Sequence, residues 1–185
     1  MLIAPVMLVV LSGCATMQED ECRTADWRDV GLRDGLVGRP SSVLADYHEA
    51  CSKHGVDPDS ELYREGRAEG LAEYCVLDNA APEGLAGRRY QNVCPVDIDR
   101  SFRQLNDAGY AVYDVRDEMD DVYGKIDSLE NELADDDTTE ERRTAIRDEL
   151  RKLDREIGRL RDDLRWKERE LDRLTATLIP VNPNP

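Results

Sequence analysis

Histidine and cysteine have the widest chemical repertoire in this chain, and His48, Cys51 and His54 follow one another at intervals of three. On a helix, such intervals place only neighbouring members of the set side by side. A zinc site needs three or four convergent ligands, so we expect surface histidines and no metal site. The sequence also has no Gly-x-Ser-x-Gly motif and no phosphate-binding glycine loop. We therefore expect neither an enzyme of those classes nor a bound cofactor.

Tyrosine and arginine side chains form a second candidate group, because together they could hold an anionic ligand. The members of this group are Tyr63, Arg67, Tyr74, Arg88, Arg89 and Tyr90. The same tyrosines are suited to packing inside a small helical domain, and we expect packing to be their main role. An enzyme, or a module that binds the cell wall or another anionic ligand through these residues, is the alternative.

The first thirteen residues are uncharged and mostly aliphatic. This run is too short for a membrane span, which needs about 20 apolar residues, and it has the character of an export signal. It ends in Leu11-Ser12-Gly13-Cys14, which resembles the lipobox of bacterial lipoproteins. The resemblance implies a signal peptide over 1–13, acylation of Cys14 and a lipid-anchored tether over 14–21. Ala15 favours the outer membrane, facing the periplasm, because an Asp there would mark inner-membrane retention. An ordinary secretory signal or a buried first helix is the alternative.

Four further cysteines, Cys22, Cys51, Cys75 and Cys94, lie in one segment. In an oxidising compartment an even number of this kind predicts two disulfides, with three possible pairings. Three short helices running up, down and up would bring Cys22 and Cys51 to one pole. Cys75 would end the third helix, and Cys94 would follow a short glycine-containing loop. We therefore favour Cys22–Cys51 and Cys75–Cys94, each stabilising by roughly 3 kcal/mol.

The segment 22–95 is expected to form a small three-helix head. Ser41 or Ser42 can cap the second helix, which runs to about Lys53. Glycine costs about 1 kcal/mol relative to alanine inside a helix, so glycines repeated on one face predict that the first and third helices cross closely, each aromatic residue lying over the partner's backbone. A strand-rich repeat is the alternative, and it is disfavoured by the many helix formers. The two stripes are Trp27, Gly31, Gly35 and Gly38, and Tyr63, Gly66, Gly70 and Tyr74.

From about Pro95 the chain is dense in charge, and apolar residues recur every three or four positions, as in a heptad seam. The seam breaks near 135–139, where three aspartates crowd a helix end. Thr138 and Glu141 then match a capping box that starts a new helix. The sequence therefore predicts an antiparallel helical hairpin over 96–179, followed by a disordered tail over 180–185. One long helix in an intermolecular coiled coil is the alternative.

Pairing of the two arms supports the hairpin. Folding the chain at the break brings Leu129 opposite Ile146 and continues in register down both arms. It also places Lys167, which departs from the seam pattern, opposite Gly109, where its stem has room. Residues 96–137 hold 14 acidic and 4 basic side chains, whereas 138–185 hold 11 acidic and 12 basic ones. One strongly acidic arm and one balanced arm suit packing against each other.

Charge also limits the partners of the whole chain. The 185 residues include 41 acidic and 25 basic side chains, a formal net charge of −16. Nucleic-acid binding depends on clustered lysine and arginine, so nucleic acid is excluded as an expected partner. We expect instead a membrane, through the lipid on Cys14, and an envelope protein bound by the hairpin.

A larger pattern in the head resembles a known family. Its elements are Asp26-Trp27, Gly31, Asp34-Gly35, Gly38, Cys51, Gly55, Tyr63, Gly66-Arg67, Gly70-Leu71, Tyr74-Cys75, Gly84, Gly87, Tyr90 and Val93-Cys94. This series is similar to the domain-of-unknown-function 2799 family of Gram-negative lipoproteins, over about 22–94 and the helical extension. The resemblance implies an envelope lipoprotein without an assigned reaction and supplies no catalytic residues. We therefore expect an all-α, non-enzymatic scaffold protein of the cell envelope.

Overall fold

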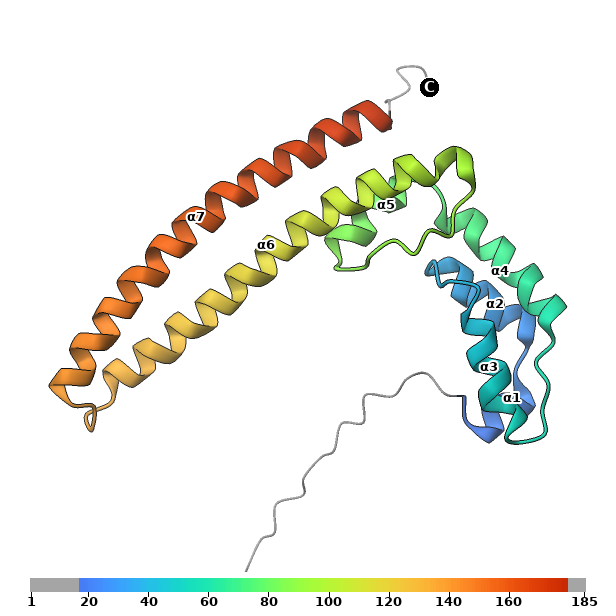
Figure 1. Ribbon diagram of the computed structural model, residues 1–185, viewed down its shortest axis with the longest axis horizontal. Coiled ribbons are helices and arrows are strands. Elements are labelled where there is room, and N and C mark those ends of the chain that lie inside the picture. Colours follow the sequence, from blue (N-terminus) through green and yellow to red (C-terminus); the bar gives the residue numbers. More distant parts are fainter. Residues whose placement is uncertain (1–16, 180–185) are drawn as a thin grey trace, which may run out of the picture. The chain divides into compact units, whose positions relative to one another are not determined.

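Residues 17–179 are described by the structure, a computed structural model, and all regular elements in this range are α-helices (Figure 1). The predicted signal peptide 1–13, Cys14, the first tether residues and the tail 180–185 lie outside the described part. No helix within 17–179 is long and apolar enough to cross a bilayer. The helices are α1 (Glu19–Thr24), α2 (Trp27–Leu36), α3 (Val43–Ser52), α4 (Ser60–Tyr74), α5 (Leu77–Leu85), α6 (Val96–Ala134) and α7 (Glu140–Leu178).

The chain divides into two compact units, and the boundary along the sequence falls within α4, where unit 1 ends at Gly70 and unit 2 begins at Leu71. This division differs from the expected head of 22–95, because α5 packs along the first part of α6 and so belongs with the hairpin. The three expected head helices are present as α2, α3 and α4. The head segment also contains α1 and α5, which the sequence did not predict.

In unit 1, α2 and α4 cross backbone to backbone through their glycines. A Cβ atom added at Gly31 would overlap the carbonyl of Tyr63, and one added at Gly66 would overlap the carbonyl of Arg28. Gly70 likewise meets the backbone of Leu32. The predicted close crossing is therefore confirmed, and it requires residues without a side chain on both helices.

The first aromatic residue of each stripe also packs against α3. Trp27 and Tyr63 lie in the buried cluster of unit 1 together with Tyr47 of α3. The ring centroids of Trp27 and Tyr47 are 6.1 Å apart, and those of Tyr47 and Tyr63 are 6.0 Å apart. Tyr47 of α3 therefore contributes to the surface against which both rings pack. The Cys22–Cys51 disulfide is buried in the same cluster.

In unit 2, α5 crosses the first part of α6 through another glycine pair. A Cβ added at Gly84 would overlap the carbonyl of Asn106, and one added at Gly109 would fall against the carbonyl of Ala81. The space beside Gly109 is thus filled by α5, which corrects the expectation that it accommodates Lys167. The second disulfide, Cys75–Cys94, closes the segment that carries α5.

Asn106 is a fully buried polar residue of α6, and both the oxygen and the nitrogen of its side-chain amide form hydrogen bonds. Its Oδ1 accepts a hydrogen bond from the backbone N–H of Tyr90 at 2.8 Å. Its Nδ2 donates to the carbonyls of Arg88 at 3.0 Å and Ala80 at 3.2 Å. A buried amide must find such partners, so Asn106 fixes α5 and the following loop onto α6.

The predicted antiparallel hairpin is confirmed (Figure 1). Helices α6 and α7 each contain 39 residues, or about 58 Å at 1.5 Å per residue. Away from the turn, polar contacts also join the arms: Arg116 pairs with Glu168 at 2.8 Å, and Arg161 donates to the Tyr123 hydroxyl at 2.8 Å. The buried seam comprises Val115, Val122, Leu129, Ile146, Leu153, Ile157 and Leu160.

The turn between the arms is held by two arginines at the start of α7. Arg143 donates to the carbonyls of Leu133, Asp135 and Thr138, and so satisfies the exposed end of α6. Arg142 forms a two-point ion pair with Glu132, both contacts at 2.7 Å. The N-cap of α7 lies one residue after Thr138, the residue that the sequence predicted.

Thr139, and not Thr138, caps α7 by accepting from the Arg142 N–H at 3.3 Å. Thr138 is turned the other way, and its hydroxyl donates to the Glu132 carbonyl at 2.6 Å. The two adjacent threonines thus serve different helices, Thr138 the end of α6 and Thr139 the start of α7.

Candidate functional site

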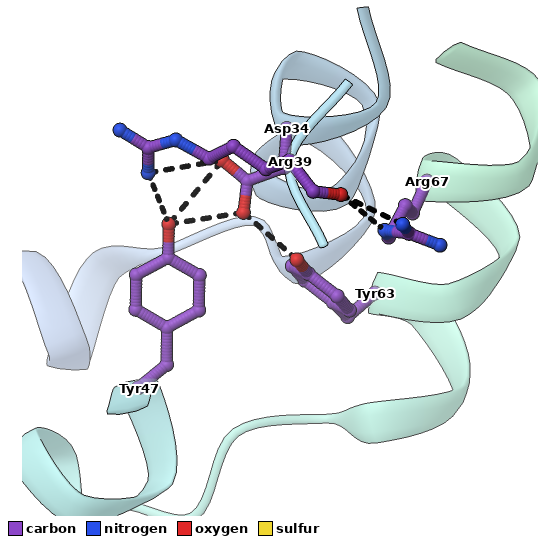
Figure 2. A network of polar contacts seen from close by, with 5 residues as sticks. All are labelled: Asp34, Arg39, Tyr47, Tyr63 and Arg67. Carbon is purple, nitrogen blue, oxygen red and sulfur yellow. Dashed lines mark hydrogen bonds and ion pairs between the residues drawn. The ribbon is translucent and has the colours of Figure 1, made fainter. Parts of the chain in front are cut away.

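Asp34 of α2 is the centre of a buried polar network in unit 1 (Figure 2). The residue is 5% exposed. Its Oδ2 accepts a hydrogen bond from the Tyr63 hydroxyl of α4 at 2.8 Å and one from the Tyr47 hydroxyl of α3 at 3.0 Å. Three helices therefore converge on one carboxylate. A buried charge of this kind requires polar partners to offset its lost hydration.

Two arginines complete the network (Figure 2). Arg39 Nη1 lies 3.3 Å from Asp34 Oδ1 and 3.2 Å from the Tyr47 hydroxyl. Arg67 of α4 donates to the Arg39 carbonyl, through Nη2 at 2.7 Å and Nε at 3.2 Å. The turn after α2 positions Arg39: Gly38 has φ +65°, and the Arg39 N–H bonds back to the Asp34 carbonyl at 2.9 Å. This is the glycine-dependent helix end known as the Schellman motif.

The chemistry of this network is that of a structural tie. Burial is the largest cause that raises the pKa of Tyr63 and of Tyr47, and the Asp34 carboxylate raises both further. Both phenols therefore stay protonated at neutral pH and donate their protons to Asp34. A general acid or base needs a pKa near the working pH, which these tyrosines do not have.

An open depression of about 460 Å³ adjoins the network, and we call it the Met17 depression. Its wall combines aliphatic and aromatic groups with two arginines and the carboxylates of Glu21 and Asp34. The other lining residues are Met17, Val30, Arg33, Val37, Arg39 and Tyr47.

The six residues suggested for an anionic ligand do not form one cluster. Tyr63 and Arg67 belong to unit 1, where the Asp34 network and the Arg39 carbonyl engage them. Tyr74 belongs to unit 2 and is buried against Phe102, with ring centroids 5.1 Å apart. Burial raises the pKa of Tyr74 to about 12.

The remaining three members lie in the loop before α6. Arg88 forms a two-point ion pair with Glu83, both contacts at 2.7 Å. The Arg89 guanidinium stacks 3.7 Å from the centroid of the Tyr110 ring. Tyr90 donates to Asp99 at 2.6 Å and accepts from the Cys94 N–H at 2.8 Å. Each of these side chains thus has a partner within unit 2.

His48 lies between Asp57 and Ser60, in the hydrogen-bond order of a serine hydrolase triad. Its Nδ1 is 3.0 Å from Asp57 Oδ1, and its Nε2 is 2.8 Å from Ser60 Oγ. The surroundings oppose that chemistry, because the Asp57 side chain is 92% exposed. The N–H groups after Ser60 already donate to the Asp59 carboxylate, whose negative charge would repel a developing oxyanion. The three residues instead tie α3 to the loop before α4 and to the first residue of α4.

The histidine–cysteine series does not form a metal site in the described residues. Cys51 is oxidised in its disulfide with Cys22. His54 Nδ1 lies 3.5 Å from Glu19, whereas His48 faces Asp57 and Ser60. Within residues 17–179 no three histidine, cysteine, aspartate or glutamate side chains come together in a way that could hold an ion.

Asp34 was named only as part of the family-like pattern and not as a candidate site residue, although a signal for such a role exists. Positions 27, 30 and 34 share one helical stripe, and Trp27 and Val30 are buried with Asp34. An acid on an apolar stripe predicts a buried carboxylate in need of donors. The sequence alone does not identify Tyr47 and Tyr63 as these donors, because they lie 13 and 29 residues away.

Comparison with known proteins gives one match. Searches of curated proteins and of solved structures found none. A family model described as "Protein of unknown function (DUF2799)" matches residues 26–111. The matched segment contains the Asp34 network, both glycine crossings and the start of α6, and it ends before most of the hairpin. Residues 26–111 of the chain are thus similar to the DUF2799 family of proteins of unknown function.

Proposed function

We propose that this protein is a non-enzymatic lipoprotein of the cell envelope that presents its helical hairpin to another envelope component. The observation that carries the proposal is the hairpin itself. Two 39-residue helices share a continuous buried seam, and the turn that joins them is held by Arg142 and Arg143. A paired arm of about 58 Å has a shape suited to spacing or contacting a partner at a fixed distance.

Two further features support an exported location. Both disulfides, Cys22–Cys51 and Cys75–Cys94, belong to the folded structure, and such bonds persist in oxidising compartments. The lipobox-like sequence before Cys14 supplies the anchor, and Ala15 favours the outer membrane with the protein facing the periplasm. A lipid-anchored protein needs no membrane-spanning helix.

Mass spectrometry of Cys14 tests the anchor. The membrane fraction should yield a chain that begins at Cys14 and carries acyl groups there. A Cys14→Ser variant should appear in the soluble fraction, with both disulfides intact because Cys14 takes part in neither. An unmodified Cys14 still preceded by residues 1–13 would contradict the proposal.

The role of the hairpin is tested by shortening both arms together. Deleting 116–129 from α6 and 147–160 from α7 removes two heptads from each arm and leaves the seam in phase. It retains the turn and the base, and it reduces the reach by about 21 Å. A photo-crosslinking residue at exposed Asp136 should capture a specific envelope protein in the full-length chain and lose it in the shortened one.

A control variant of full length separates the effect of the hairpin's reach from the effect of its stability. Gly158→Ala lies on an open face of α7 and should leave capture unchanged. If the shortened chain captures the same protein equally well, the hairpin does not set a working distance. If instead the full chain binds a cell-wall fragment or a small anion, and the shortened chain binds it equally well, the binding-module alternative replaces the scaffold.

A further inference from the structure

The segment that joins Cys14 to the described part of the chain is short. The described chain begins at Met17, and only two residues separate it from Cys14. Three extended residues span at most about 11 Å. Met17 is packed against the buried cluster of unit 1, so it moves with that unit. Any anchor on Cys14 therefore holds unit 1 close to the lipid.

The surface around Met17 combines apolar and arginine side chains. Val37 shares the Met17 depression and is 56% exposed, and its neighbour Leu36 is 41% exposed. Both follow one another at the end of α2, where Arg33 and Arg39 flank them along the chain. Arginine can extend its apolar stem along a membrane surface while its charged group stays in water. Aliphatic residues beside such arginines suit the boundary between headgroups and acyl chains.

We infer that unit 1 rests on the phospholipid surface through a membrane face made of Met17, Arg33, Leu36, Val37 and Arg39. This inference rests on the proposed acylation of Cys14. Two aliphatic side chains bind lipid weakly alone, but a short tether keeps them at the surface at high effective concentration. The anchor supplies the attachment, and the membrane face sets the orientation of unit 1.

The charges on this face predict which lipids it accepts. Arg33 pairs with Asp29 at 3.2 Å, and Arg39 pairs with Asp34 at 3.3 Å. Because a carboxylate offsets each guanidinium, the face has little net positive charge to attract anionic headgroups. The contact should therefore form on zwitterionic phosphatidylethanolamine and phosphatidylcholine, and added anionic lipid should not strengthen it.

The test uses the chain from Cys14 onward, coupled through the Cys14 thiol to a maleimide lipid in vesicles of those two phospholipids. A fluorescent amino acid at Val37 reports its distance from lipids that carry a nitroxide quencher on the headgroup. The matched control places the same probe at Ala68, an exposed residue of α4. Gly66 and Gly70 face α2, so Ala68, midway between them, lies on the opposite side of α4.

Quenching severalfold stronger at Val37 than at Ala68 is the expected result, and a probe at Leu36 should agree. Circular dichroism confirms that each labelled chain is folded. Equal quenching at Val37 and Ala68 would overturn the membrane face even if Cys14 is acylated in cells. Fluorescence at Val37 that changes with protein density, and not with quencher, would assign the face to a second copy and also overturn it. An unmodified Cys14 in cells would overturn the anchor and this inference with it.

Discussion

Tyr63 of α4 donates its hydroxyl proton to the Asp34 carboxylate of α2 across 2.8 Å, at the centre of unit 1. The same carboxylate oxygen also accepts from Tyr47 of α3. A single acid thus specifies how three helices meet. Glycine contacts allow α2 and α4 to approach, and the carboxylate fixes the arrangement that they reach.

Asp34→Ala should destabilise unit 1 by about 3 kcal/mol or more. The substitution leaves the hydroxyls of Tyr47 and Tyr63 without their acceptor, and an unsatisfied buried donor costs about 1–3 kcal/mol. Urea unfolding followed by circular dichroism measures the loss. Asp46→Ala on the exposed side of α3 is the control and should change stability by less than about 1 kcal/mol. Equal effects of the two substitutions would show that Asp34 does not organise the unit.

Gly66→Ala and Gly158→Ala should change stability in opposite directions. At Gly66 the new methyl group meets the Arg28 backbone, and overpacking of this kind costs about 1–3 kcal/mol or more. At Gly158 nothing lies within 4 Å of the added atom, so the better helix propensity of alanine should stabilise by about 1 kcal/mol. Thermal unfolding of both variants checks the pair. A Gly66→Ala protein as stable as the parent would contradict the backbone contact.

Arg143→Lys should loosen the hairpin turn. The guanidinium reaches three carbonyls at once, whereas the lysine ammonium lacks a planar fork and cannot reproduce that geometry. We expect a loss of about 1–2 kcal/mol and faster amide hydrogen exchange at residues 134–140. Arg147→Lys, an exposed neighbour one turn along, is the matched control. Exchange that accelerates equally in both variants would mean that Arg143 does not close the turn.

Alkaline pH should weaken unit 2 through its buried tyrosines. Burial raises the pKa of Tyr74 and of Tyr90 to about 12, from a usual value of 10.0. Because the folded state holds these protons more tightly, their stabilising contribution is complete below pH 10 and is lost as pH rises through about 12. Denaturant unfolding at several values in this range should show falling stability. Tyr90→Phe should flatten the fall, and an unchanged slope would contradict the assignment.

Much of the fold was predictable from periodicity. The regular recurrence of Val115, Val122 and Leu129 specifies a helix and one buried face, and the matching series after Ile146 specifies the second arm. Glycine spacing predicted the α2–α4 crossing, the alternating helix directions favoured Cys22–Cys51, and the short loop after the third helix favoured Cys75–Cys94. These features depend on local pattern, which the sequence displays directly.

Features that depend on distant partners were missed. Helix α5 contains Pro82 and Gly84 within nine residues, a composition typical of a loop, and it is held as a helix by its contact with α6. The role of Arg143 as a cap was missed because Leu133, one of its acceptors, precedes it by ten residues. In both cases tertiary contacts decide a conformation that local propensity leaves open.

The Cys75–Cys94 disulfide has a mechanical consequence. Cys75 directly follows α4, and Cys94 precedes α6 by two residues. Tension applied at the hairpin tip and transmitted along α6 would therefore cross from one helix to the other through the sulfur–sulfur bond. The intervening loop with α5 would carry none of that load, so it would remain folded on α6 while the arm is pulled.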